Sequence, residues 1–370
     1  MASDDFHCQC NFDTLFSKNI PRILEKIFLS LDYASFKNCL EVSKAWKGIL
    51  TSERYIAKAR SVFEFEIAMD ERKLCYAAKD GNTDKAKMIL AIGMVHVNSK
   101  KKYGSTPLHT AVEYGHKEVA EVLIELGAAV NVNCKNYHGR TPLLSAAKGG
   151  HTEVTQLLIE CGADPNVAGN DEHMNGRTPL HEAVYYGHKE VAELLIAHAA
   201  DPNVKETRGR TPLHEATMLG RKELAKLLIE YGADPDMVDN YGKSPIHGAG
   251  YQMTQLLIES GADPNVRENY GRTPLHEAAM TGQKEVAELL IENGADPNVT
   301  SNYGATPLHM AIKKKYAKGY AKGLAELLIE HVADLNVTDN EGRTPLKKAV
   351  KCGLNEVAEL LIERGADMDG

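Results

Sequence analysis

Residues 271–299 read GRTPLHEAAMTGQKEVAELLIENGADPNV, and this stretch decides the fold because similar copies of it fill most of the chain. The intervals between successive copies are 35, 37, 33, 33, 29, 33 and 38 residues. Self-similarity near this period predicts a stack of small units, each contacting its neighbours, rather than one globular core. A Thr/Ser-Pro-Leu/Ile signature marks the copies, at Thr106, Thr141, Thr178, Thr211, Ser244, Thr273, Thr306 and Thr344.

Each copy predicts two short helices. Thr273 is placed to cap the first helix, and Pro274 fits its first turn, where a missing N–H is tolerated. Gly282 is expected to end this helix, and Gly294 to end a second helix with an apolar stripe that includes Leu290. Neither helix can bury its apolar face alone, so stacking of neighbouring copies must supply the core.

The unit resembles the ankyrin repeat over about four-fifths of the chain, from Leu74 to the C-terminus. The first copy, LCYAAKDGNTDKAKMIL, lacks Thr-Pro and is similar to an N-terminal capping repeat. The resemblance implies an all-α solenoid of about nine repeats over residues 71–370, which binds another protein on its concave face.

A histidine follows most Thr-Pro-Leu signatures. Rings on neighbouring helices, about 8–10 Å apart, cannot share one metal ion. We expect each ring to order its Thr-Pro turn by hydrogen bonding instead. The histidines are His109, His181, His214, His247, His276 and His309.

Composition excludes several classes of function. The net charge is −8 with acidic and basic residues interleaved, which does not favour nucleic acid as a partner. No apolar run reaches the length of a membrane span. Seven cysteines without framework spacing indicate reduced thiols, and hence a cytoplasmic or nuclear protein. We expect no metal site at His7, Cys8 and Cys10, no cofactor, and no enzyme, because no nucleophile–base pair or phosphate-binding loop is evident.

Three copies differ in length from the rest. The copy between Pro245 and Gly261 is four residues short, which predicts the loss of about one helical turn and a notch in the stack. Lys313–Gly323 gains five residues and is basic, and Ala168–Gly176 gains four. These length changes either form contacts with a partner or reflect neutral drift in surface loops, which tolerate insertions.

The copies also differ just after the histidine and just before the helix-ending glycine, at positions expected to face away from the stacked core. Aromatic and Met side chains rimmed by carboxylates are typical of protein-recognition hot spots. The alternative is that some of them pack between repeats. The predicted substrate-binding residues are Tyr114, Glu182, Tyr185, Tyr186, Glu215, Met218, Leu219, Glu277 and Met280. The loop tips add Tyr103, Tyr241, Tyr270 and Tyr303.

Residues 20–50, IPRILEKIFLSLDYASFKNCLEVSKAWKGIL, do not repeat. Apolar residues recur at helical spacing and predict three short helices, too few to bury this apolar surface by themselves. The segment therefore needs a second surface, either the first repeats or another protein.

The pattern Ile-Pro, Ile-Leu-x-x-Ile-Phe-x-x-Leu-Asp, Phe-x-x-Cys-x-x-Val-Ser-x-x-Trp resembles an F-box. The family's usual acidic residue between the proline and Ile-Leu is absent here, and that gap is one residue shorter. The resemblance implies that residues 18–53 bind a Skp-family adaptor and, through it, a cullin–RING ubiquitin ligase. The residues that match the adaptor-binding positions are Pro21, Leu24, Ile27, Phe28, Leu31, Val42 and Trp46.

The sequence thus predicts a disordered tail (1–17), an F-box-like head (18–53), a linker helix (54–70) and the ankyrin array (71–370). The function implied is a non-catalytic substrate receptor of a Skp–cullin–F-box ubiquitin ligase. The alternative is an ankyrin scaffold whose N-terminal helices only cap the repeat stack.

Overall fold

The computed structural model describes residues 73–91, 95–101, 103–128, 132–169, 176–312, 320–331 and 334–367. The F-box-like head, the linker helix and the tail lie outside the described residues. The chain divides into two compact units, Met1–Val132 and Asn133–Gly370. Each is treated separately below.

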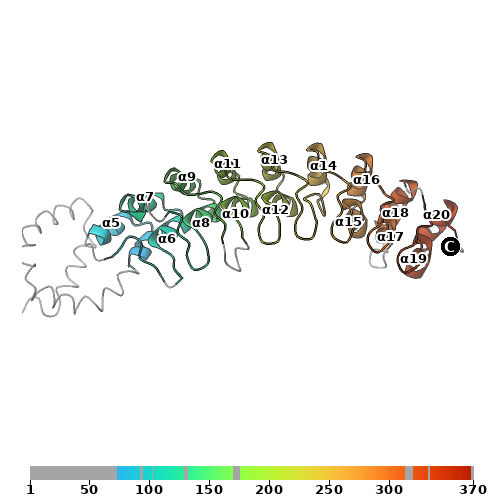
Figure 1. Ribbon diagram of the computed structural model, residues 1–370, viewed down its shortest axis with the longest axis horizontal. Helices are drawn as coiled ribbons and strands as arrows, with labels where there is room; N and C mark the ends of the chain where they lie inside the picture. Colours follow the sequence, from blue (N-terminus) through green and yellow to red (C-terminus); the bar gives the residue numbers. More distant parts are fainter. Residues whose placement is uncertain are drawn as a thin grey trace, which may run out of the picture. The chain divides into compact units, whose positions relative to one another are not determined.

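The described residues form helices and no strand. In the first unit, helical residues 73–79 precede α5 (Thr83–Ala91), and α6 (Pro107–Glu113) packs against α7 (Lys117–Glu125). In the second unit each repeat except the short one again contributes a first and a second helix, which form two rows (Figure 1).

The first-helix row of the second unit contains α8 (Pro142–Gly149), α10 (Pro179–Tyr186), α12 (Pro212–Met218), α15 (Pro274–Thr281), α17 (Pro307–Ala311) and α19 (Pro345–Cys352). The second-helix row contains α9 (Thr152–Glu160), α11 (Lys189–Ala197), α13 (Lys222–Glu230), α14 (Tyr251–Glu259), α16 (Lys284–Glu292), α18 (Tyr320–His331) and α20 (Asn355–Glu363). The all-helical repeat array expected from the sequence is confirmed for these residues.

The core runs along the stack between the two rows. Leu180 on α10 and Leu195 on α11 are fully buried, and Leu213 and Leu228 occupy the same places in the next repeat. Burying a leucine side chain stabilises a fold by about 1.5–3 kcal/mol. Because successive repeats add such pairs, stability is distributed along the array rather than concentrated at one centre.

The predicted helix ends are confirmed where the structure describes them. Thr106 and Thr306 cap α6 and α17 through their side chains, and a proline follows each cap. The helix-ending glycines Gly187 and Gly282 have φ values of +84° and +79°, a left-handed conformation that glycine adopts without a steric penalty. Local sequence therefore sets where each first helix begins and ends.

The short repeat departs further from the pattern than a lost helical turn. It has no first helix, and residues 245–248 form only a turn. Its second helix, α14, keeps the usual nine residues and is N-capped by Gly250. Pro245 and Ile246 remain buried, as at the start of a first helix, but the C-terminal half of that helix is absent. The first-helix row therefore passes from α12 to α15 through a single turn.

The two insertions fall mainly outside the described residues, which omit 170–175 and 313–319. No described helix is long and apolar enough to span a membrane.

Candidate protein-binding surface

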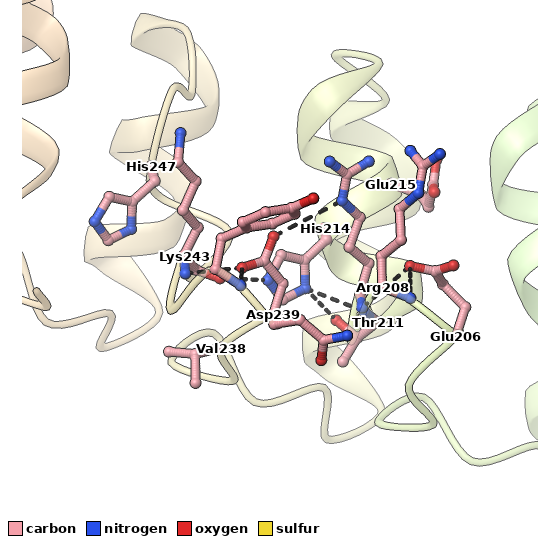
Figure 2. Close-up of polar contacts among 12 residues, drawn as sticks. Glu206, Arg208, Thr211, His214, Glu215, Val238, Asp239, Lys243 and His247 are labelled. Atoms are coloured by element: carbon pink, nitrogen blue, oxygen red, sulfur yellow. Dashed lines mark hydrogen bonds and ion pairs between the residues drawn. The ribbon is translucent and has the colours of Figure 1, made fainter. Parts of the chain in front are cut away.

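In several repeats of the second unit, a histidine joins the cap of the first helix to the next repeat. The backbone N–H of Thr211 donates to His214 Nδ1 at 3.1 Å, and the Thr211 hydroxyl lies 2.9 Å from the same nitrogen. Because Nδ1 accepts, the neutral ring carries its proton on Nε2, which donates to the Lys243 carbonyl at 2.9 Å (Figure 2). One imidazole thus orders its own turn and binds the following repeat.

The same bond recurs in other repeats of the second unit. The Nε2 atoms of His181, His276 and His309 each lie 3.0–3.1 Å from a carbonyl oxygen of the next repeat. His247, in the short repeat, is the exception: its Nε2 is buried and forms no hydrogen bond of acceptable geometry. The Arg272 carbonyl, the counterpart of the usual acceptor, raises the pKa of His247, but burial outweighs this effect.

Burial keeps these rings neutral. It lowers the pKa of His181 and of His276 to about 4, despite the opposing effect of the backbone carbonyl that each ring contacts. Burial also lowers the pKa of His214, His247 and His309. The predicted turn-ordering role is confirmed for the bonded histidines, and the described residues contain no cluster that could hold a metal ion.

The loop tips are aligned by a ladder of asparagines. Asn240 Nδ2 donates to the Thr207 carbonyl at 2.9 Å, and Asn269 Nδ2 donates to the Asn240 carbonyl at 3.0 Å. Within a tip, Asp239 Oδ1 accepts the backbone N–H groups of Tyr241 and Lys243 at 2.8 and 2.9 Å. These bonds hold the tips in register, so their tyrosines are presented in a fixed order.

Most of the predicted aromatic and Met positions are exposed. Tyr185, Tyr186 and Leu219 are about two-fifths exposed, and Met218 is 59% exposed. The Tyr185 and Tyr186 rings meet edge to face with centroids 5.1 Å apart. Tyr114, in the first unit, is also exposed. Exposed apolar side chains at the ends of consecutive first helices form the kind of surface that binds proteins. Their role in binding stays a prediction.

The expectation that the carboxylates rim this surface is wrong for Glu182 and Glu215, which are 4% and 3% exposed. Arg177 lies between them: its Nη2 is 2.8 Å from Glu215 and its Nη1 is 3.4 Å from Glu182. The guanidinium also lies 4.4 Å from the centroid of the Tyr185 ring. Charge pairing thus draws both carboxylates between the repeats and fixes the orientation of Tyr185.

Arg177 was not anticipated from the sequence, although a signal existed. An arginine or lysine precedes most Thr/Ser-Pro signatures, and glutamate often follows the histidine. The same pairing recurs two repeats later along the array, where Lys243 Nζ lies 2.7 Å from Glu277 Oε1. Glu277 and Met280 are half-buried, and Met280 Sδ lies 3.9 Å from Arg272 Nη1.

The predicted adaptor-binding residues, from Pro21 to Trp46, lie outside the described residues. The structure therefore brings together the predicted substrate-binding positions of α10 and α12.

Comparison with known families agrees with the array. Models of ankyrin repeats (3 copies) match residues 74–169, 129–206, 167–239, 198–268, 247–322 and 300–370. No F-box or enzyme family is found, and a search of the curated proteins gives no match. Ankyrin repeats are protein-interaction modules, and their matches cover the chain from residue 74 to residue 370. This chain belongs to the ankyrin-repeat family.

Proposed function

We propose that this protein is a non-catalytic substrate receptor of a Skp–cullin–F-box ubiquitin ligase. The array holds the protein to be modified, and residues 18–53 bind the Skp-family adaptor. The chain itself makes and breaks no bond. Its contribution is proximity, because holding a substrate beside the conjugating enzyme raises the effective concentration of the reacting groups.

The observation that carries the proposal is the spacing of apolar residues in the non-repeating head. Ile23-Leu24 and Ile27-Phe28 are followed by Leu31-Asp32, and the later block extends from Phe36 to Trp46 in the same order as the F-box motif. Helices as short as those predicted from this spacing expose more apolar surface than they can bury together, so a partner surface is required.

The proposal that the array binds the substrate rests on exposed side chains at the C-terminal ends of the first helices α10 and α12. Tyr185, Tyr186, Met218 and Leu219 provide large apolar side chains on adjacent helices, and Arg177 fixes one of the rings. Ordered aromatic side chains lose little conformational entropy on binding, which favours them as anchors.

The test is a pull-down of the full chain with a purified Skp-family adaptor. We expect the wild type to bind, and the double variant Leu24→Ala, Trp46→Ala to lose binding. Glu25→Ala with Lys26→Ala is the matched control, because both are polar positions in the same segment, and it should bind like the wild type. Absence of binding by the wild type would refute the ligase role.

The same variants test the alternative scaffold, in which residues 20–50 cap the first repeat. In that case Leu24→Ala with Trp46→Ala would lower the thermal unfolding temperature of the chain by several degrees, and no adaptor would bind the wild type. Adaptor binding by the wild type would contradict the scaffold alternative.

A further inference from the structure

At several places among the described residues, a side chain from one repeat covers the helix-ending glycine of the repeat before it, although no described side chain covers Gly282. A Cβ added to Gly150 would lie 2.5 Å from His188 Nδ1, and a Cβ added to Gly187 would lie 2.5 Å from Arg221 Nη1. The covering residue is the N-cap of the second helix in each case. A planar, nitrogen-rich side chain therefore fills this place repeatedly.

Where the covering side chain is a histidine, it also forms a hydrogen bond. His188 Nε2 lies 3.1 Å from the Lys148 carbonyl, two residues before Gly150. In the first unit His116 does the same, covering Gly81 and lying 2.8 Å from the Lys79 carbonyl. We use the term glycine cradle for the helix-ending glycine together with the carbonyl two residues before it.

The cradle at the end of α12 has no such occupant. It consists of Gly220 and the Met218 carbonyl, and the N-cap of the following second helix is Gly250, which has no side chain to offer. A Cβ added to Gly220 or to Gly250 would have no atom within 4 Å. No described side chain donates a hydrogen bond to the Met218 carbonyl.

The chemistry of this cradle favours a guanidinium. Imidazole and guanidinium groups already occupy the equivalent cradles of this chain. The free acceptor is one of the last carbonyls of α12, at the negative end of the helix dipole, where a cation is stabilised. Met218 and Leu219 are exposed beside it and can pack against an aliphatic stem. An arginine side chain meets all three conditions.

An acidic groove begins at Tyr251, the residue that follows Gly250 in the chain. Tyr251, Glu285, Glu288, Leu289 and Glu292 line a cavity of about 540 Å³ between α14 and α16. No described residue forms an ion pair with any of the three carboxylates.

Two features leave the groove negatively charged. Tyr251 stands where α11, α13 and α16 begin with a lysine, so the short repeat replaces a cation with an exposed aromatic ring. Lys284, the lysine at the start of α16, lies beside α18 instead: a Cβ added to Gly323 of α18 would be 3.7 Å from Lys284 Nζ. Partner cations could then contact both the carboxylates and the Tyr251 ring.

We propose that the α12 cradle and the Tyr251 groove together bind a basic segment of a partner protein. An arginine of that segment occupies the cradle, and the lysine or arginine residues that follow it lie in the groove. This inference rests on the part of the proposed function that assigns protein binding to the array, and not on adaptor binding by residues 18–53.

The test uses the full chain and the blocked peptide acetyl-GGRGKKGG-amide, titrated by calorimetry at about 0.15 M salt to limit non-specific attraction. Replacing the peptide arginine with citrulline keeps its shape and removes its charge. We expect this change to weaken binding about tenfold or more, because a charge-assisted hydrogen bond contributes about 1.5–3 kcal/mol.

The decisive variant is Gly250→Arg, which supplies from within the chain the side chain that Arg221 supplies at Gly187. The Gly250 backbone, with φ of −77° and ψ of 165°, accepts any residue, so the variant should fold. We expect Gly250→Arg to weaken peptide binding at least tenfold, and the control Gly250→Ala to bind like the wild type. Glu288→Gln with Glu292→Gln should weaken binding several-fold.

Failure to bind the peptide, equal binding of the citrulline peptide, or full binding by Gly250→Arg would each overturn the proposal. The Skp-adaptor pull-down, repeated with Gly250→Arg, separates the two proposals because it should be unchanged. If Gly250→Arg loses peptide binding but keeps adaptor binding, the effect of the substitution lies in the cradle. Absence of adaptor binding with intact peptide binding refutes only the ligase role.

Discussion

The imidazole of His214 is hydrogen-bonded to the backbone of two repeats, accepting from the Thr211 N–H and donating to the Lys243 carbonyl at 2.9 Å. A ring that accepts through one nitrogen and donates through the other must be neutral. The hydrogen bond between neighbouring repeats therefore requires a neutral imidazole. It also requires that the histidine be held by the threonine of its own repeat.

Acidification is expected to destabilise the array. The folded-state pKa of His181 and of His276 is about 4, below the ordinary value of 6.5, so the unfolded chain binds more protons between these limits. The stability they contribute is complete above pH 6.5 and is lost as the pH falls toward 4. At about pH 5 each of the two histidines should contribute about 2 kcal/mol less to the free energy of unfolding than at pH 7. Urea unfolding followed by circular dichroism at the two pH values measures this, and His181→Gln should reduce the pH dependence. Equal pH dependence in wild type and variant would contradict the assignment.

Thr211→Ala should destabilise the protein by about 1–2 kcal/mol, because it removes a helix cap and the hydroxyl that contacts His214. Thr211→Ser is the matched control and should stay within about 0.5 kcal/mol of the wild type. The short repeat already uses serine at this position, where Ser244 contacts His247. Chemical denaturation of the three proteins provides the comparison. Equal loss in both variants would show that the methyl group, not the hydroxyl, matters.

Arg177→Met should cost about 3 kcal/mol of folding free energy, because Glu182 and Glu215 would remain buried without their cation. Neutralising the carboxylates as well, in the triple variant with Glu182→Gln and Glu215→Gln, should restore most of the loss. Urea midpoints measured for both variants check this. If the triple variant is no more stable than Arg177→Met, the ion pairs are not the cause of the loss.

Leucine should be tolerated better at residue 247 than at residue 214. Both substitutions remove the contact with the capping hydroxyl, but only His214→Leu removes a bond to the next repeat. Leu144 shows that leucine fits this position in another repeat. We expect His214→Leu to cost about 1 kcal/mol more than His247→Leu, the net contribution of one hydrogen bond. Thermal unfolding of the two variants tests the ordering, and the reverse order would show that His247 is bonded in solution.

Local sequence was sufficient to predict much of the candidate site. The helix boundaries follow from Thr-Pro caps and left-handed glycines, which act over three or four residues. The exposure of Tyr186 and Met218 followed from their place at the end of a first helix. The burial of Glu182 and Glu215 did not follow, because Arg177 reaches Glu215 across 38 residues of sequence.

The sequence by itself determined the repeat, the caps, the turn-ordering histidines and the position of the short copy, since each depends on residues close together in the chain. Only the tertiary structure decided which donors and acceptors meet between repeats. It showed that Glu182 and Glu215 are drawn inward, that His247 lacks its bond, and that Gly250 leaves the cradle at Gly220 without a side chain. These features depend on the register of one repeat against the next, which stacking fixes and local sequence does not encode.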